Sequence, residues 1–149
     1  MNRYFFVVAA VIVSSGILPV RISAQPATNS PHRQIAAAEL REAKRELESV
    51  REDRSGRVKE AVKAIDRAIW ALDFALTKVG ETPGVVALDP ARFPEFKDQV
   101  QLRRALYDLE AARDEVAAAQ GDPWGLRKQA LQDTQTAIDS LKDLLPTGK

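Results

Sequence analysis

The sequence predicts an all-α protein: a four-helix bundle made of two repeated antiparallel helical hairpins joined by a proline-containing crossover. Three observations support this fold. Apolar residues recur every three or four positions in four segments, glycine and proline fall between those segments, and the first pair of segments resembles the second. A chain of 149 residues suits one domain with a single core.

The first 24 residues predict a secretory signal peptide. Arg3 precedes a nearly uncharged run, residues 4–20, and Ile22-Ser23-Ala24 offers a small-residue cleavage site. The run is shorter than the roughly 20 apolar residues that span a bilayer, although a retained anchor stays an alternative. We expect residues 1–24 to be removed, no stable membrane span afterwards, and a mature chain in the periplasm or outside the cell.

The mature composition excludes several classes of partner. Loss of Arg3 and Arg21 reduces 22 basic residues to 20, against 21 acidic ones, so the net charge becomes −1. Interspersed charges of both signs argue against a surface for nucleic acid or anionic membranes. The chain has no cysteine, so we expect packing rather than disulfides to hold it together.

The first hairpin is expected at residues 31–80, after a polar leader at residues 25–30. Ser30 and Pro31 supply a helix start, Asp53 is expected to cap the second helix, and Gly80 to end it. The inward positions are Ala36, Leu40, Ala43, Leu47 and Val50, then Val58, Ala61, Ile65, Ala68, Leu72, Ala75 and Val79, widened by Val62, Ile69 and Leu76.

The second hairpin is expected at residues 95–146, which completes a bundle domain spanning 31–146. Three prolines interrupt residues 81–94, so this stretch is predicted to be the crossover. The third helix is expected from Pro94 or Glu95 to Gln120, and the fourth after Asp122 as its cap. The inward positions are Leu102, Ala105, Leu109, Ala112, Val116 and Ala119, then Ala130, Thr134, Ala137, Ile138, Leu141 and Leu145.

A shift of 69 residues superimposes the two hairpins without a gap. It pairs Asp53 with Asp122 and Gly56 with Gly125 at the turns, together with many helix positions. Helical composition alone would align Ala and Leu, but not also the turn residues. The sequence therefore predicts a duplicated hairpin, each copy burying the apolar stripe of the other.

The first hairpin also resembles a family of short, uncharacterised exported bacterial proteins, whose hairpin opens with Pro-His and turns through Asp-Lys-Gly-Gly-His-Arg. The matching residues are Pro31, His32, Ala36, Leu40, Ala43, Leu47, Asp53, Gly56, Ala61, Ile65, Ala68 and Ile69. Ser55 replaces the first turn glycine, and the turn histidine is absent from both copies, although Arg127 matches the arginine. The resemblance implies a helical fold and export, and no reaction.

Catalytic, cofactor and metal sites are not predicted. His32 is the only histidine, Met1 is the only methionine and is lost with the signal, and cysteine is absent, which removes the usual haem, metal and nucleophile residues. An enzyme would need a mechanism built on Asp, Glu, Lys and Arg alone, and no cluster of these stands out. We expect no enzyme, no cofactor and no metal.

The aromatic residues are the main candidates for an interaction surface. Trp70 and Phe74 lie one turn apart, off the seam of their helix. Two interpretations stay open: a pocket or partner-facing patch, or a satellite cluster buried where the crossover folds back over the second helix. Trp124 at the second turn is a partner contact or a cap over the bundle end. The candidate surface comprises Trp124, Arg127, Trp70, Phe74, Phe93 and Phe96.

The sequence thus favours a non-enzymatic exported protein that acts by contact with an unknown protein partner or by self-association. The alternative is a small apolar ligand held in the bundle core. Thr134 motivates that alternative, since it places a polar side chain at an inward position where the first repeat has Ile65.

Overall fold

The computed structural model describes residues 30–51, 53 and 55–146, which form an all-α four-helix bundle. The helices are α1 (Ser30–Glu48), α2 (Arg57–Lys78), α3 (Val100–Ala118) and α4 (Leu126–Lys142), with two short 3-10 helices, η1 (Pro90–Arg92) and η2 (Pro123–Gly125). The predicted fold class is confirmed. The expected signal peptide, residues 1–24, lies outside the described residues.

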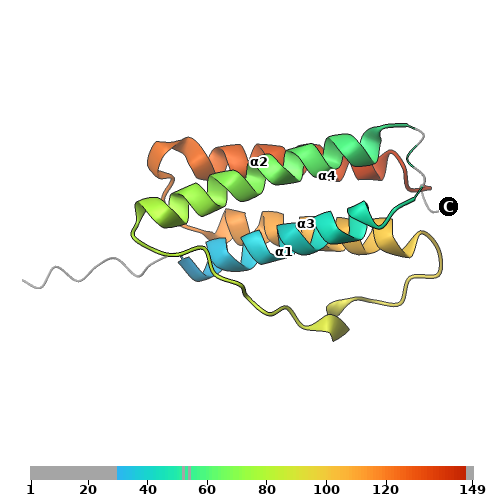
Figure 1. Ribbon diagram of the computed structural model, residues 1–149, viewed down its shortest axis with the longest axis horizontal. Coiled ribbons are helices and arrows are strands. Elements are labelled where there is room, and N and C mark those ends of the chain that lie inside the picture. Colours follow the sequence, from blue (N-terminus) through green and yellow to red (C-terminus); the bar gives the residue numbers. More distant parts are fainter. Residues whose placement is uncertain (1–29, 52, 54, 147–149) are drawn as a thin grey trace, which may run out of the picture.

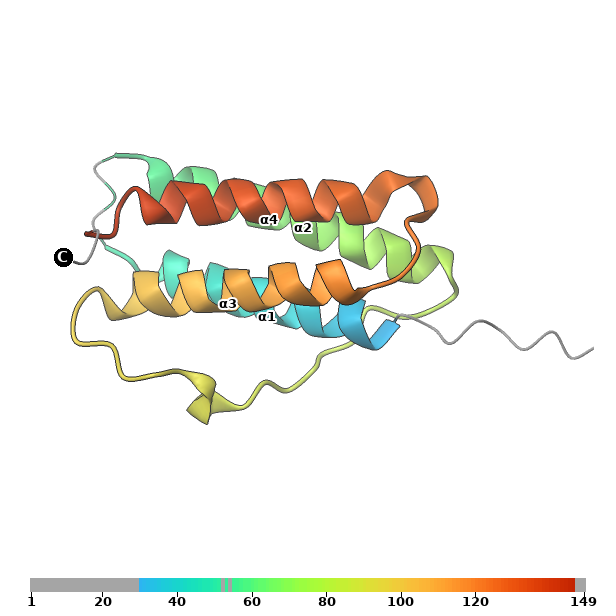
Figure 2. The same ribbon diagram turned by 180° about the vertical axis from the view of Figure 1, so that it is seen from behind.

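The four helices form two layers, with α1 beside α3 and α2 beside α4 (Figure 1). Neighbouring helices run antiparallel, as the view from behind also shows (Figure 2). Because α2 ends at one end of the bundle and α3 begins at the other, the chain must return along its whole length. Residues 79–99, called the crossover from here on, make this return across the outer side of the α1/α3 layer.

The core follows the predicted apolar spacing. Most inward positions are buried: Ala36, Leu40, Ala43, Leu47, Val58, Ala61, Ile65, Ala68, Leu72, Ala75, Leu76, Ala105, Leu109, Ala112, Val116, Ala119, Ala130, Thr134, Ala137, Ile138 and Leu141. The buried positions mix small alanines with leucines and isoleucines, a pattern that lets the ridges of one helix fit into the grooves of its neighbour. Val79 is an exception at 43% exposed, because α2 ends at Lys78 and Val79 belongs to the crossover.

The third helix begins later than the spacing predicted. It starts at Val100 rather than at Pro94 or Glu95. Its N-cap residue, Gln99, has a φ of 45°, a left-handed conformation that interrupts a right-handed helix. The crossover is therefore longer than expected, and it brings more side chains over the α1/α3 layer.

Asp53 and Asp122, the predicted caps, accept hydrogen bonds from the first turn of α2 and α4, but the N-cap positions of these helices are Gly56 and Gly125. The backbone N–H of Lys59 donates to Asp53 Oδ2 at 3.1 Å, and the backbone N–H of Lys128 donates to Asp122 Oδ2 at 3.1 Å. Each carboxylate satisfies a donor in the first turn of the following helix from a position outside that helix.

A left-handed glycine directly precedes the second helix of each hairpin. Gly56 has a φ of 74° and Gly125 a φ of 72°. In the second turn Trp124 is left-handed as well, with a φ of 67°, so α4 begins at Leu126 after η2 rather than directly after Asp122. A tryptophan rarely adopts this conformation.

Candidate functional site

Two aromatic rings project from the outer face of α2. Trp70 and Phe74 stack with their centroids 5.3 Å apart and their planes 12° from parallel. They are 55% and 37% exposed, and the Lys78 ammonium lies 4.9 Å from the Phe74 centroid. The expectation that the crossover buries these rings is wrong, because the crossover lies on the other layer. Trp70 and Phe74 are called the α2 aromatic pair below.

A second aromatic cluster ties the crossover to α3. The rings of Phe93 and Tyr107 meet edge to face at 5.7 Å, and the guanidinium groups of Arg92 and Arg104 lie 4.2 and 5.1 Å from the Phe93 centroid. Phe96 is half buried and takes no part in this ring pair. A satellite cluster does form, but on α3 rather than on α2.

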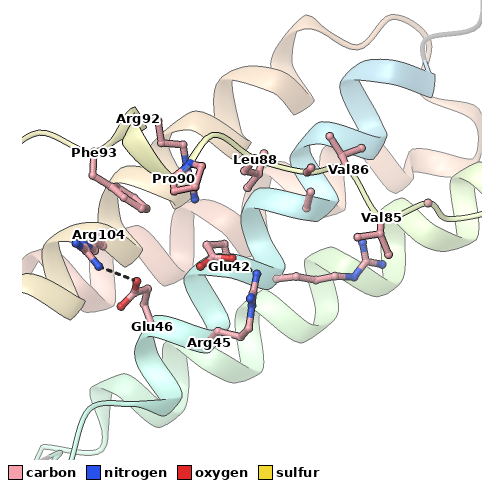
Figure 3. A pocket seen from close by; sticks show the side chains of 14 residues that line it. Glu42, Arg45, Glu46, Val85, Val86, Leu88, Pro90, Arg92, Phe93 and Arg104 are labelled. Atoms are coloured by element: carbon pink, nitrogen blue, oxygen red, sulfur yellow. Dashed lines mark hydrogen bonds and ion pairs between the residues drawn. The ribbon is translucent and has the colours of Figure 1, made fainter.

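A hollow of about 550 Å³ lies between the crossover and α1 (Figure 3). Its crossover side is mainly apolar, and its helix side is charged. The lining residues are Ala38, Arg41, Glu42, Arg45, Glu46, Gly84, Val85, Val86, Ala87, Leu88, Pro90, Arg92, Phe93 and Arg104. A volume of this size matches small-molecule sites. The sequence had suggested a ligand in the bundle core, but this hollow lies outside the core.

The arginines of the hollow are held by carboxylates. Arg41 donates to both oxygens of Asp73 at 2.8 and 2.7 Å. Arg45 pairs with Glu42, and Arg104 lies 3.6 Å from Glu46. An anionic ligand would therefore have to compete with an internal carboxylate for each of these three guanidinium groups.

Two acidic side chains are buried where α1 and α3 meet. Asp108 on α3 is fully buried, and Glu39 on α1 is 8% exposed. Arg92 of the crossover donates to Asp108 Oδ1 at 2.9 and 3.2 Å, but Asp108 Oδ2 and Glu39 Oε2 find no hydrogen-bond partner among the described residues. Buried carboxylates without partners are costly when ionised.

Burial shifts the proton affinity of both acids upward. Desolvation, followed by the negative charges of Glu115 and Asp108, raises the pKa of Glu39 to about 7. Desolvation also raises the pKa of Asp108 to about 6, although the Arg92 guanidinium opposes the shift.

Sequence reasoning missed these acids although a signal was present. Glu39 lies three residues after the inward Ala36 and four before the inward Ala43, and Asp108 has the same spacing from Ala105 and Ala112. The 69-residue shift that aligns the hairpins also aligns Glu39 with Asp108. An acid at the same inward position in both hairpins distinguishes this pair from the charges of the wet face.

The residues at the second turn have different surroundings. Trp124 is 64% exposed and stacks on no other ring within the described part of the chain, so it does not cap the bundle end. Arg127 donates to the backbone oxygens of Val116 at 2.9 Å and Ala117 at 2.7 Å. Arg127 thus satisfies the last carbonyls of α3, as helix ends require.

The single histidine also lies at a helix end. His32 Nδ1 is 2.7 Å from Glu115 Oε2 on α3, and its side chain is 45% exposed. Within residues 30–51, 53 and 55–146, no three His, Asp or Glu side chains gather as metal ligands would. In the same residues, no helix combines the length and apolarity needed to cross a bilayer.

No protein-family model, curated protein or solved structure matches the chain. The fold defines the class of protein, an all-α four-helix bundle with a long crossover. The resemblance to exported helical-hairpin proteins stays a prediction.

Proposed function

We propose that the mature chain is an exported, non-enzymatic protein that acts by binding a protein partner or a second copy of itself. The observation that carries the proposal is the α2 aromatic pair. Large, stacked and exposed rings are enriched at protein interfaces because they bury much apolar area and lose little conformational entropy. Surrounding charges, such as Lys78 beside Phe74, would form the polar rim of such a contact.

The test is crosslinking in cells with a tagged chain, followed by mass spectrometry. The wild type is compared with a Trp70→Gln, Phe74→Gln double variant and with a Trp124→Gln control, which removes a ring that is more exposed but isolated. We expect a reproducible crosslinked species that the double variant loses and the control keeps. Equal crosslinking by all three proteins would reject the α2 surface, and recovery of monomer alone would reject association.

The export part of the proposal rests on the signal peptide predicted at residues 1–24. N-terminal sequencing of the recovered chain tests it. A chain that starts at Gln25 supports cleavage and a periplasmic or extracellular location. A chain that starts at Met1 in the membrane fraction indicates a retained anchor, and the same chain in the cytoplasm contradicts export.

Small-ligand binding is the second candidate, and the hollow beneath the crossover favours it. Its apolar crossover wall and charged floor suit an amphipathic molecule better than a purely apolar one. Ala38→Phe would fill the hollow from its floor, whereas Thr134→Leu would fill the core position proposed from sequence. Thermal stabilisation by a ligand that is lost only in Ala38→Phe assigns the hollow, and loss only in Thr134→Leu assigns the core.

We further propose that the bundle arose by duplication of one hairpin. The turn aspartates make matching hydrogen bonds, the turn glycines share a left-handed conformation, and the two layers pair α1 with α3 and α2 with α4. A duplicated hairpin explains why a pair of buried acids meets where α1 and α3 face each other. Residues 30–80 expressed alone should associate into dimers, and a stably folded monomer would contradict this origin.

A further inference from the structure

A charged residue extends the α2 aromatic pair at each of its ends. Asp66, Trp70, Phe74 and Lys78 follow one another at intervals of four residues, so they form one continuous ridge along the outer face of α2. All four side chains are exposed. This set is called the α2 ridge below. From its N-terminal end, the ridge consists of an acid, two aromatic rings and a base.

Both charged ends of the ridge are accessible to a partner. Lys44 of α1 donates to Asp66 Oδ1 at 2.7 Å, but the Asp66 side chain is still 51% exposed, and a carboxylate accepts hydrogen bonds from more than one cation. The exposed Lys78 ammonium lies 4.9 Å from the Phe74 centroid. Two flanking charges are instead neutralised within the chain, in the ion pairs Arg67–Asp133 and Arg41–Asp73.

A ridge with this order of residues is complementary to its own reversed copy. If the α2 helices of two chains pack antiparallel, Trp70 of each lies beside Phe74 of the other, and Asp66 of each lies beside Lys78 of the other. Interdigitation of such four-residue ridges is the commonest way in which helices pack, and a two-fold axis makes every contact twice. A parallel pair would instead place like charges together at both ends.

We propose that the partner bound at the α2 ridge is a second copy of this chain, packed antiparallel about a two-fold axis that passes between the two aromatic pairs. This inference rests on the proposed function, since it names the partner of the same surface. The rings form the apolar centre of the contact, and the charges at its rim set the direction of the helices. The crossover lies over the other layer, so this face is open to a second copy (Figure 1).

Charge reversal combined with analytical ultracentrifugation tests the proposal. The full-length chain is expressed and purified as the cell processes it, and its sedimentation is measured over a series of concentrations. The variants are Asp66→Lys, Lys78→Asp, a chain that carries both changes, and an equimolar mixture of the two single variants. The matched control is Asp114→Lys, which reverses a 72% exposed acid on α3, in the other layer, that is also ion-paired, with Arg113.

We expect the wild type to dimerise. Each single reversal creates two like-charge contacts in the dimer and should raise the dissociation constant by about 10-fold or more. The chain with both changes regains opposite charges at both ends, and the mixture regains them in a heterodimer, so both should dimerise as the wild type does. Asp114→Lys should also match the wild type, and circular dichroism should show equal helix content in all the proteins.

Three outcomes would overturn the inference: a wild type that is monomeric throughout the series, single reversals that dimerise as well as the wild type, or no recovery in either the mixture or the chain with both changes. The fate of the proposed function is measured separately. A monomeric wild type whose crosslinked product in cells still depends on Trp70 and Phe74 would refute the second copy and keep the contact surface for another protein. Absence of both the dimer and the product would reject both.

Discussion

The α1/α3 layer and the α2/α4 layer contain helices of similar length but bury different chemistry. Among the described residues, the α1/α3 layer buries the charged side chains Arg33, Glu39 and Asp108, whereas the buried polar residues of the α2/α4 layer are the neutral Thr134 and Ser140. The crossover lies over the charged layer and leaves the α2 aromatic pair exposed on the other. One chain segment therefore gives two similar layers different surfaces: a covered side above buried acids and an uncovered side with exposed aromatic rings.

Removal of Arg92 should have the largest effect. Arg92→Ala leaves Asp108 buried without its guanidinium, and breaking a buried pair in this way costs about 3 kcal/mol. We expect the free energy of unfolding, measured in urea, to fall by this amount at pH 8. It should fall by less at pH 5, where Asp108 takes up a proton. Arg103→Ala removes a surface pair with Asp98 and should cost less than about 1 kcal/mol. Equal losses in the two variants would contradict a special role for the covered layer.

Neutralising Glu39 should stabilise the protein, and only at high pH. Because its pKa is raised from 4.5 to about 7, the contribution of Glu39 to stability is fully present below about pH 4.5 and is lost as the pH rises through about 7. Glu39→Gln should therefore add roughly 2 kcal/mol to the free energy of unfolding at pH 8 and almost nothing at pH 5. A gain independent of pH would show that packing, not charge, is responsible.

Removing a buried polar group from the α2/α4 layer should have a smaller effect on the free energy of unfolding, and this effect should be independent of pH. Thr134 Oγ1 is buried and lacks a hydrogen-bond partner within the described chain. Thr134→Val keeps the side-chain volume and removes the hydroxyl. The free energy of unfolding, measured by thermal denaturation, should therefore rise by about 1 kcal/mol. Ser140→Ala is the control: its hydroxyl already donates to Thr136 O at 2.9 Å, so no similar gain is expected. Destabilisation by Thr134→Val would indicate a bound water or ligand at the hydroxyl.

The smallest effect on stability should come from the α2 aromatic pair. Both rings are exposed, so Trp70→Gln with Phe74→Gln should change the free energy of unfolding by less than about 0.5 kcal/mol, measured by urea unfolding. A loss of several kcal/mol would show that the stacked rings stabilise the fold instead of forming a contact surface.

The sequence predicted the fold and the core well, because apolar spacing and turn residues act locally. Helix α1 starts at Ser30 as Ser30-Pro31 indicated, and Asp53 and Asp122 both accept hydrogen bonds from the first turn of the following helix, although Gly56 and Gly125 occupy the N-cap positions. The predicted start of α3 was wrong. Gln99 adopts a left-handed conformation, and the sequence does not signal this conformation as a glycine would. Ala64 and Ala71 are buried beyond the predicted seam because α2 contacts two neighbouring helices.

The candidate site was only partly predictable. The stacking of Trp70 with Phe74 follows from their spacing of one turn, but their exposure depends on which layer the crossover covers. That choice is made by Arg92 with Asp108 and by Phe93 with Tyr107, contacts between distant segments. Arg127 could be placed at the second turn, but its bonds to the end of α3 required the geometry of the helix terminus.

Site-specific photocrosslinking in cells tests the central claim, that the α2 side is the contact side, most directly. A benzophenone amino acid replaces Phe74 in one chain and Trp124 in another. Our account predicts a discrete crosslinked product from position 74 and none from position 124. A product from position 124, with none from position 74, would contradict it.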